Sequence, residues 1–225
     1  MIATLAVAQK EIRHGLNALF FYLIAVVFAA APAFSLFWNP APTNVFISNH
    51  TSLVGFFQVL PLFLTVFVPA LAMRAYGEEH HAGSFELLLT QAGDWPIVLG
   101  KFLGSFIILL VGLAATFGLP LLVAQLGDLD WGPVFGGYLG AVLFGAVCLA
   151  VCLSAGVFCP NQTSSFVVSL CLLGTLMVLP VPALNIQTRF QNFAEGLVLF
   201  PDLGFFIGLT ACFLTINRIA IGLRR

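Results

Sequence analysis

The sequence predicts an all-α membrane protein, and this prediction rests on its composition, its long apolar runs and the placement of its charges. Of the 225 residues, 60% are hydrophobic and only 8% are charged, and the mean hydropathy is +1.08. About a quarter of the residues of a soluble domain are charged, so this chain needs lipid as its solvent. The net charge of −1 comes without a basic patch, so no nucleic-acid partner is expected.

The N-terminal residues 1–15 predict an amphipathic helix that lies on the inner leaflet before the first span, a frayed terminus being the alternative. The apolar face of this helix carries Ile2, Leu5, Ile12 and Leu16, and the polar face carries Gln9, Lys10, Arg13 and His14. The following apolar run, with "APA" at 31–33, also resembles a secretory signal and its cleavage site. Because the run continues to Trp38, an uncleaved first span is favoured.

Six membrane-spanning helices follow from the apolar runs. No Lys, Arg, Asp or Glu occurs between Arg13 and Arg74, a stretch too long for one span of about 20 residues. The loop at 39–52, "NPAPTNVFISNHTS", divides it, since Pro, Asn and Ser are typical of solvated loops. The predicted spans are 16–38, 53–74, 97–126, 134–158, 165–183 and 203–221.

A second amphipathic piece is predicted between the fifth and sixth spans, within 184–202. Its apolar side chains recur at helical spacing, and they are Phe190, Phe193, Ala194 and Leu197. Polar side chains occupy much of the remaining surface, namely Gln187, Arg189, Gln191 and Glu195. This pattern predicts a short helix at the outer interface, and an ordinary loop touching the bilayer is the alternative.

The basic residues predict the orientation of the chain. All eight Lys and Arg residues except Arg189 fall on one side of the predicted spans, which the positive-inside rule assigns to the cytoplasm. Asp128, Asp130, Glu195 and Asp202 fall on the other side. We therefore expect both termini and the loop at 75–96 to be cytoplasmic.

The loop at 75–96 predicts a short cytoplasmic helix. Gly83 and Gly93 bracket it, Ser84 can act as its N-cap, and Glu86 suits the positive end of its dipole. One face is apolar, formed by Phe85, Leu88 and Leu89 with Leu87 beside it. Such a short helix is marginal alone in water, so it needs a surface of its own bundle or a groove of a partner. Asp94 is expected to cap the next helix, with Pro96 in its first turn.

No catalytic or metal-binding constellation is expected. The four consecutive side chains of "EEHH" at 78–81 would be spread around a helix. In His-Glu-x-x-His, by contrast, the two histidines lie on one face and can bind the same ion. Cys148, Cys152 and Cys159 lie near one stripe of the fourth span and could pass Cu(I), although buried thiols usually only pack. The chain lacks a serine elbow and a phosphate-binding loop, so it is not expected to be an enzyme or to hydrolyse ATP. Few ionisable groups lie within the spans, so ion-coupled transport fits poorly and the energy must enter from outside.

The segment 62–105, "LFLTVFVPALAMRAYGEEHHAGSFELLLTQAGDWPIVLGKFLGS", resembles the second span, coupling segment and third span of ABC-2-type transporter permeases. The likeness is closest to the gliding-motility-associated branch, and it extends to the permease of the nitrous-oxide reductase maturation system. "LGDLDWGPVFGGYLG" at 126–140 resembles the outer loop and fourth-span start of that branch, and "CPNQTSSFVVS" at 159–169 resembles its inner loop.

The resemblance implies that residues 1–225 form one transmembrane domain in the bacterial inner membrane. It implies a separate ABC ATPase subunit that binds ATP and Mg²⁺, no cofactor in this chain, and a second permease that is identical or related. The coupling surface for the ATPase would consist of Glu78, Glu79, Gly83, Ser84, Phe85, Glu86, Leu87 and Leu88. As an alternative, Leu87 to Leu89 could pack against the helices of their own chain instead of a partner.

Two further choices stay open at the level of sequence. The pairs Gly100/Gly104 and Gly136/Gly140 allow close helix approach, either between two permeases or within one chain. The expected function is export of a substrate driven by the ATPase. The alternative is a subunit that transmits force to a periplasmic or outer partner without carrying a solute.

Overall fold

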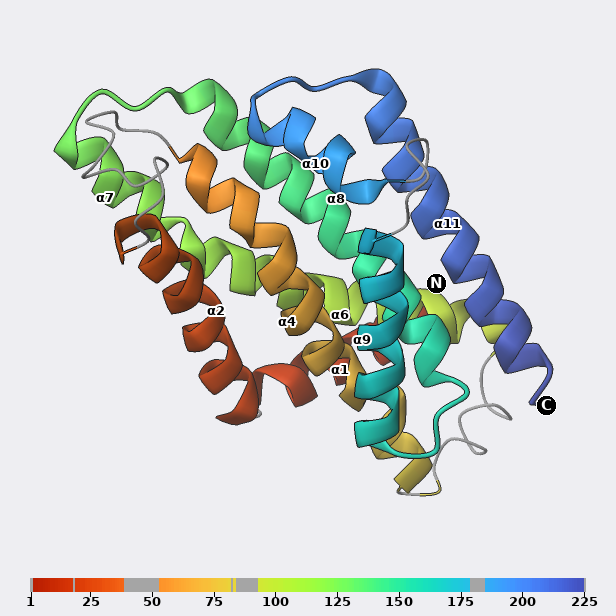
Figure 1. Ribbon diagram of the computed structural model, residues 1–225. Helices are drawn as coiled ribbons and strands as arrows, with labels where there is room; N and C mark the ends of the chain where they lie inside the picture. Colours follow the sequence, from red (N-terminus) through yellow and green to blue (C-terminus); the bar gives the residue numbers. More distant parts are fainter. Residues whose placement is uncertain are drawn as a thin grey trace.

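The computed structural model describes residues 2–17, 19–38, 53–81, 83, 93–178 and 185–224. These residues form helices joined by short turns, and none of them belongs to a strand (Figure 1). The predicted all-α architecture is confirmed for this part of the chain.

Four stretches of the described chain are long and apolar enough to cross a membrane, which supports the prediction of a membrane protein. These stretches are Val54–Gly77, Asp94–Gln125, Trp131–Gly156 and Phe200–Gly222. They belong to α4 (Val54–His81), α6 (Asp94–Thr116) with α7 (Gly118–Leu126), α8 (Trp131–Gly156) and α11 (Phe200–Gly222).

Two further apolar helices coincide with the other predicted spans, 16–38 and 165–183. They are α2 (Leu19–Trp38) and α9 (Gln162–Val178). The apolar stretches described within them, Ala25–Phe34 and Gln162–Val178, are shorter than the four stretches above. That α2 and α9 cross the membrane stays a prediction.

The span predicted at 97–126 closely matches the apolar stretch Asp94–Gln125, and the structure adds an interruption in its helix. α6 ends at Thr116, and α7 begins after Phe117. Pro120 has no N–H to donate to the carbonyl oxygen of Thr116, so the regular ladder cannot continue there. The Thr116 hydroxyl donates to the carbonyl oxygen of Leu113 (2.6 Å) and lies 3.1 Å from the Tyr138 hydroxyl of α8.

Helix α8 is the centre of the bundle. It contacts α4, α6, α9, α11 and the short helix α10 (Ile186–Ala194), and it is buried along most of its length. By contrast, α11 packs with one side and leaves most of its surface exposed. Because lipid tails are as apolar as leucine, close packing holds such helices together more than hydrophobic burial does.

The predicted outer amphipathic helix is α10, and Phe190, Phe193 and Ala194 are buried as expected. The placement of Leu197 on the same face is wrong, because this residue follows the helix and is 56% exposed. Helix α10 ends at Ala194 with Glu195 as its C-cap, and Gly196 turns the chain away with a φ of +83°. A residue with a Cβ atom is disfavoured at this backbone angle.

The pair Gly136/Gly140 of α8 provides the surface on which α10 lies. A Cβ atom on Gly136 would lie 2.6 Å from the carbonyl oxygen of Phe193 and 3.0 Å from the Cα atom of Gly196. A Cβ atom on Gly140 would lie 2.7 Å from the Cβ atom of Phe193. Only glycine permits this approach without movement of the backbone.

The pair Gly100/Gly104 of α6 is filled by α1 (Ile2–Asn17). A Cβ atom on Gly100 would lie 2.7 Å from the Cβ atom of Val7, and one on Gly104 would lie 2.6 Å from the Cβ atom of Glu11. A Cβ atom on Gly15, further along α1, would clash with the side chain of Ile108 of α6. The two helices therefore run side by side in the same direction, and both glycine pairs are occupied by helices of the same chain.

The glycine contacts can be tested with two matched alanine variants in the first turns of span-length helices. Gly136→Ala should unfold at lower temperature in detergent than Gly204→Ala, because in the described chain no atom lies within 4 Å of a Cβ on Gly204. Both substitutions gain the same helix propensity, so their difference reports the clash with α10, about 1–3 kcal/mol. Equal melting temperatures for the two variants would contradict the packing described.

Candidate functional site

The candidate site is the end of the bundle from which the segment between α4 and α6 emerges. α4 continues as a helix to His81, so residues 75–81, predicted as loop, are helical. α6 begins at Asp94, and its N-cap is Gly93, which makes no side-chain cap bond. The predicted capping role of Asp94 is therefore wrong, although its carboxylate lies in the first turn, where a negative charge suits the helix dipole.

The structure describes only part of the predicted coupling surface. The backbone of Glu78 and Glu79 belongs to the last turn of α4. Gly83 is exposed and has a φ of +65°, a left-handed conformation that favours glycine and explains this residue at the turn. The other members, Ser84, Phe85, Glu86, Leu87 and Leu88, lie outside the described residues.

Lys101 of α6 is the central polar residue of this end, and its side chain is fully buried. Its Nζ donates a hydrogen bond of 2.7 Å to Oε1 of Glu11 and another to the carbonyl oxygen of Ala75. The ammonium group also lies 4.8 Å from the centre of the Tyr76 ring, a cation–π distance. Lys101 therefore joins α6 to α1 through Glu11 and to α4 through Ala75 and Tyr76.

Burial makes these partners of Lys101 necessary. Transfer of an ammonium group from water into the protein interior costs several kcal/mol. A countercharge and hydrogen bonds are needed to offset this cost. Glu11 supplies the countercharge, and its own side chain is 15% exposed. The sequence places Lys101 at the border of the third span but carries no signal for Glu11, which lies 90 residues away in the chain.

The network extends from α4 to α11. The Tyr76 hydroxyl donates a hydrogen bond of 3.1 Å to Oδ1 of Asn217, which is also fully buried. Among the described residues, none accepts a hydrogen bond from Nδ2 of Asn217. The hydroxyl of Ser154 on α8 donates to the carbonyl oxygen of Phe213 at 2.8 Å, one turn before Asn217. Polar contacts thus connect four helices, α1, α4, α6 and α11, while α8 contributes Ser154.

Two arginines fasten the end of α11 to its neighbours. The guanidinium carbon of Arg218 lies 5.1 Å from the centre of the Trp95 ring, in the first turn of α6. Arg224 donates a hydrogen bond of 3.1 Å to the carbonyl oxygen of Phe158, in the connection between α8 and α9. Basic side chains therefore cluster around the place where the segment between α4 and α6 emerges.

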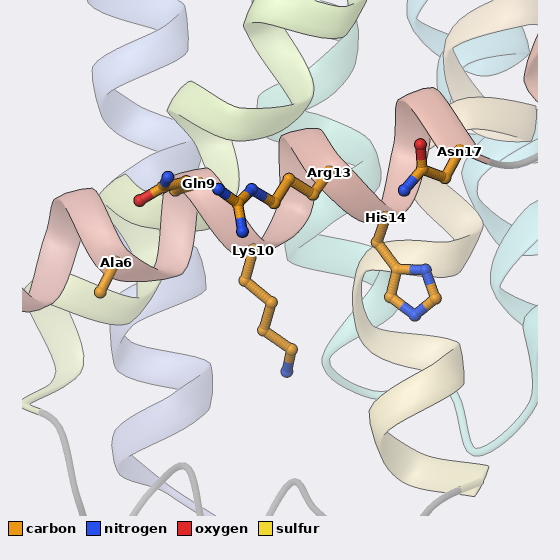
Figure 2. Close-up of a pocket in the computed structure, with 6 residues that line it drawn as sticks. All are labelled: Ala6, Gln9, Lys10, Arg13, His14 and Asn17. Atoms are coloured by element: carbon orange, nitrogen blue, oxygen red, sulfur yellow. The ribbon is translucent and has the colours of Figure 1, made fainter.

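An open groove of about 500 Å³ lies on the exposed side of α1, at the same end. The described residues that line it are Ala6, Gln9, Lys10, Arg13, His14 and Asn17. Figure 2 shows Lys10 and His14 extending to the same side of the helix, while the guanidinium group of Arg13 turns back toward Gln9. The predicted polar face of the N-terminal helix is confirmed as a solvent-accessible surface.

The opposite end of the bundle holds a second ion pair. Arg189 of α10 donates to Oδ1 of Asp202 at 2.6 Å, and Asn192 donates to Oδ2 of the same carboxylate at 2.8 Å. Arg189 also lies 4.4 Å from the centre of the Phe205 ring. The one basic residue predicted on this side therefore has a structural role, because it attaches α10 to the start of α11.

The described chain forms no cluster that resembles a metal site. Within it, no three His, Cys, Asp or Glu side chains gather closely enough to hold an ion. Cys148, Cys152 and Cys159 are buried free thiols, as expected for packing residues. The side chains of His80 and His81 lie outside the described part.

No family model matches this chain, and no curated protein matches it. The fold and the site therefore define a class: an α-helical membrane protein with two attached amphipathic helices. At its basic end, a buried ion pair lies close to the end of α4 and the first turns of α6.

The ion pair at Lys101 can be tested by a double-mutant cycle. Glu11→Ala leaves a buried ammonium without a countercharge and should destabilise the protein by about 3–5 kcal/mol. Glu11→Ala with Lys101→Met removes both charges and should recover more than half of that loss, since an apolar replacement needs no partner. Thermal unfolding of the purified chain in detergent measures both effects. A double variant as unstable as the sum of its two single variants would exclude coupling between the two side chains.

Proposed function

We propose that this chain is the permease subunit of an ATP-driven ABC-2-type transporter that exports a substrate across the bacterial inner membrane. One observation carries the proposal: the segment between α4 and α6 leaves and re-enters the bundle at one place. Lys101 of α6 binds the carbonyl oxygen of Ala75 on α4, so the two flanks of the segment are held together. A short segment whose two flanks are held together is suited to transmit a displacement imposed by a separate subunit.

The contacts of Lys101 provide a path by which such a displacement can spread to other helices. Displacement of the segment moves the start of α6 and the end of α4, because both flanks are helical up to their junctions with it. Lys101 and Glu11 pass the movement to α1, and Tyr76 and Asn217 pass it to α11. A chain of packed polar contacts of this kind can carry coupling between distant parts of a bundle.

In this proposal α2 and α9 also cross the membrane, giving six spans with both termini in the cytoplasm. The distribution of basic side chains supports the orientation, since all of them except Arg189 belong to one side. ATP and Mg²⁺ bind to a separate ATPase subunit, and the permease itself needs no cofactor.

A second permease, identical or related, completes the transporter. Because α1 fills Gly100/Gly104 and α10 fills Gly136/Gly140, the two permeases must meet through other surfaces. The most exposed of the four span-length helices, α11, offers the largest uncovered face.

A second function, transmission of force to a periplasmic partner, is favoured by one feature. The connection from α10 to the first residue of α11 exposes four consecutive apolar side chains, Leu197, Val198, Leu199 and Phe200. A run of this kind suits contact with another protein or with lipid. Co-purification of the tagged chain distinguishes the functions: a recovered ATPase supports both, and a stoichiometric outer protein supports force transmission.

Charge reversal in the coupling segment tests the proposed function. Glu79→Lys or Glu86→Lys should abolish stimulation of the co-purified ATPase while the protein still inserts and remains monodisperse, because only the charged contact with the ATPase is reversed. ATP hydrolysis is measured in vesicles with the permease present and absent. Glu195→Lys, an exposed charge at the opposite end, is the matched control and should behave as wild type. Full coupled activity of both reversed variants would overturn the proposal.

A further inference from the structure

The exposed apolar run between α10 and α11 lies where two span-length helices begin. Its side chains are those of residues 197–200, and Phe200, the first residue of α11, is 87% exposed. Figure 1 shows helix α10, the start of α8 and the start of α11 at the same end of the bundle. The run is therefore level with the first turns of α8 and α11, both of which are long enough to cross a membrane.

Helix α10 itself offers no apolar surface at this end. Its apolar face is used against α8, where Phe190 and Phe193 are fully buried. Its exposed side chains include Gln191, and its C-cap Glu195 is exposed as well. The amphipathic pattern of α10 is therefore satisfied by protein, and any contact with lipid at this level has to come from the residues that follow the helix.

The start of α8 adds aromatic side chains to the same level. A Cβ atom on Gly196 would lie 3.2 Å from the backbone nitrogen of Pro133, so the run begins beside the first turn of α8. Trp131, the first residue of that helix, and Phe135, one turn later, are both exposed, and their ring centres lie 6.0 Å apart. Tryptophan is enriched at the level of lipid headgroups, because its ring is apolar at one end and polar at the other.

The backbone of the run restricts the depth at which it can lie. The N–H of Leu197 donates to the carbonyl oxygen of Asn192 at 2.8 Å, but the N–H groups of Val198 and Leu199 have no acceptor among the described residues. Irregular backbone facing lipid is not tolerated in the hydrocarbon core, where no water can satisfy it. The side chains of the run require an apolar medium and its backbone requires water or headgroups. Only the boundary between acyl chains and headgroups offers both.

The exposed surface that continues from the run favours lipid over a protein partner. On α11, the exposed side chains from Phe200 to Ile216 carry no charge, and Ile207 is 59% exposed. On α8, which contains no charged residue, exposed Leu139 continues the stripe of Trp131 and Phe135. The run is thus continuous with the apolar surface that these two helices present to acyl chains, and it does not form a separate patch.

The ion pair between α10 and α11 fits the same depth. Asp202 follows Phe200 by two residues, so it lies about 3 Å further along the axis of α11. Its side chain is nearly buried, and its carboxylate accepts hydrogen bonds from Arg189 at 2.6 Å and from Asn192 at 2.8 Å. Ionisable residues within a membrane are paired with one another. A carboxylate just inside the boundary needs the partners that Asp202 has.

We propose that residues 197–200, together with Trp131 and Phe135, form an interfacial anchor that binds the lipid boundary at the α10 end of the bundle. The side chains of the interfacial anchor enter the acyl region, and its backbone stays at the level of the headgroups. The lipid is recognised by the boundary between its apolar and polar parts, and no particular headgroup is required. The interfacial anchor does not depend on the proposed transport function, since it needs only the bundle and a bilayer.

The test measures the depth of tryptophan side chains in vesicles of phosphatidylcholine that is brominated either near the headgroup or near the methyl end of its acyl chain. In a chain whose three tryptophans are replaced by phenylalanine, Phe200→Trp should lose more emission to bromine near the headgroup. Ile207→Trp lies about 10 Å further along α11 and should lose more emission to bromine near the methyl end. Gln191→Trp, on the exposed side of α10, is the matched control and should lose little to either.

A second measurement uses the natural Trp131 and needs only two conservative changes. With Trp38→Phe and Trp95→Phe, Trp131 is the one remaining tryptophan, and bromine near the headgroup should quench it more than bromine near the methyl end. This measurement keeps the test valid if the chain without tryptophan does not fold.

Three results would overturn the proposal. Quenching of Phe200→Trp as weak as that of Gln191→Trp would mean that the run projects into water. Stronger quenching of Phe200→Trp by bromine near the methyl end would place the irregular backbone in the hydrocarbon core, against the argument from its open N–H groups. Quenching that appears only after a co-purified protein is stripped away would assign the run to a protein partner.

Discussion

A buried ammonium group is the constraint on which this arrangement depends. Lys101 cannot reach water, so its charge must be balanced inside the bundle. The countercharge comes from Glu11 and the second acceptor from Ala75, which fixes α1 along α6 and joins the end of α4 to the same point. The flanks of the segment between α4 and α6 are brought together by the same requirement. Stability and the proposed transmission of movement therefore share one residue.

The two amphipathic helices, α1 and α10, are each attached to the bundle by two kinds of contact, one at a glycine pair and one through an ion pair. On α1, Glu11 serves both, because its Cβ atom lies over Gly104 while its carboxylate reaches Lys101. On α10, Phe193 lies over the glycines of α8, and Arg189 pairs with the nearly buried Asp202. The glycine pair allows the close approach, and the ion pair selects the register. Ridge and groove packing alone would leave that register less specific.

The attachment of α1 also determines what the surface of this end presents. Because Glu11 is withdrawn by Lys101, the exposed polar side of α1 is left with Lys10, Arg13 and His14. The internal ion pair and the exposure of these three side chains are thus two consequences of one packing arrangement. If α1 rotated by one residue, about 100°, Glu11 would turn away from Lys101. On helix α10, by contrast, the arginine is used internally, in the ion pair with Asp202.

The sequence alone determined the class of the protein, the approximate positions of four span-length helices and the buried face of α10. Desolvation cost and helical periodicity act along the chain, so composition and spacing report them directly. Tertiary structure alone decided the pairing of Glu11 with Lys101 and the exposure of Leu197. The interruption after Thr116 has a local cause in Pro120. Apart from Val7, the residues of α1 that contact α6 are small or polar, so this face gives only a weak hydrophobic signal. Its partner lies 90 residues away, and no local pattern encodes which buried charge a distant carboxylate must balance.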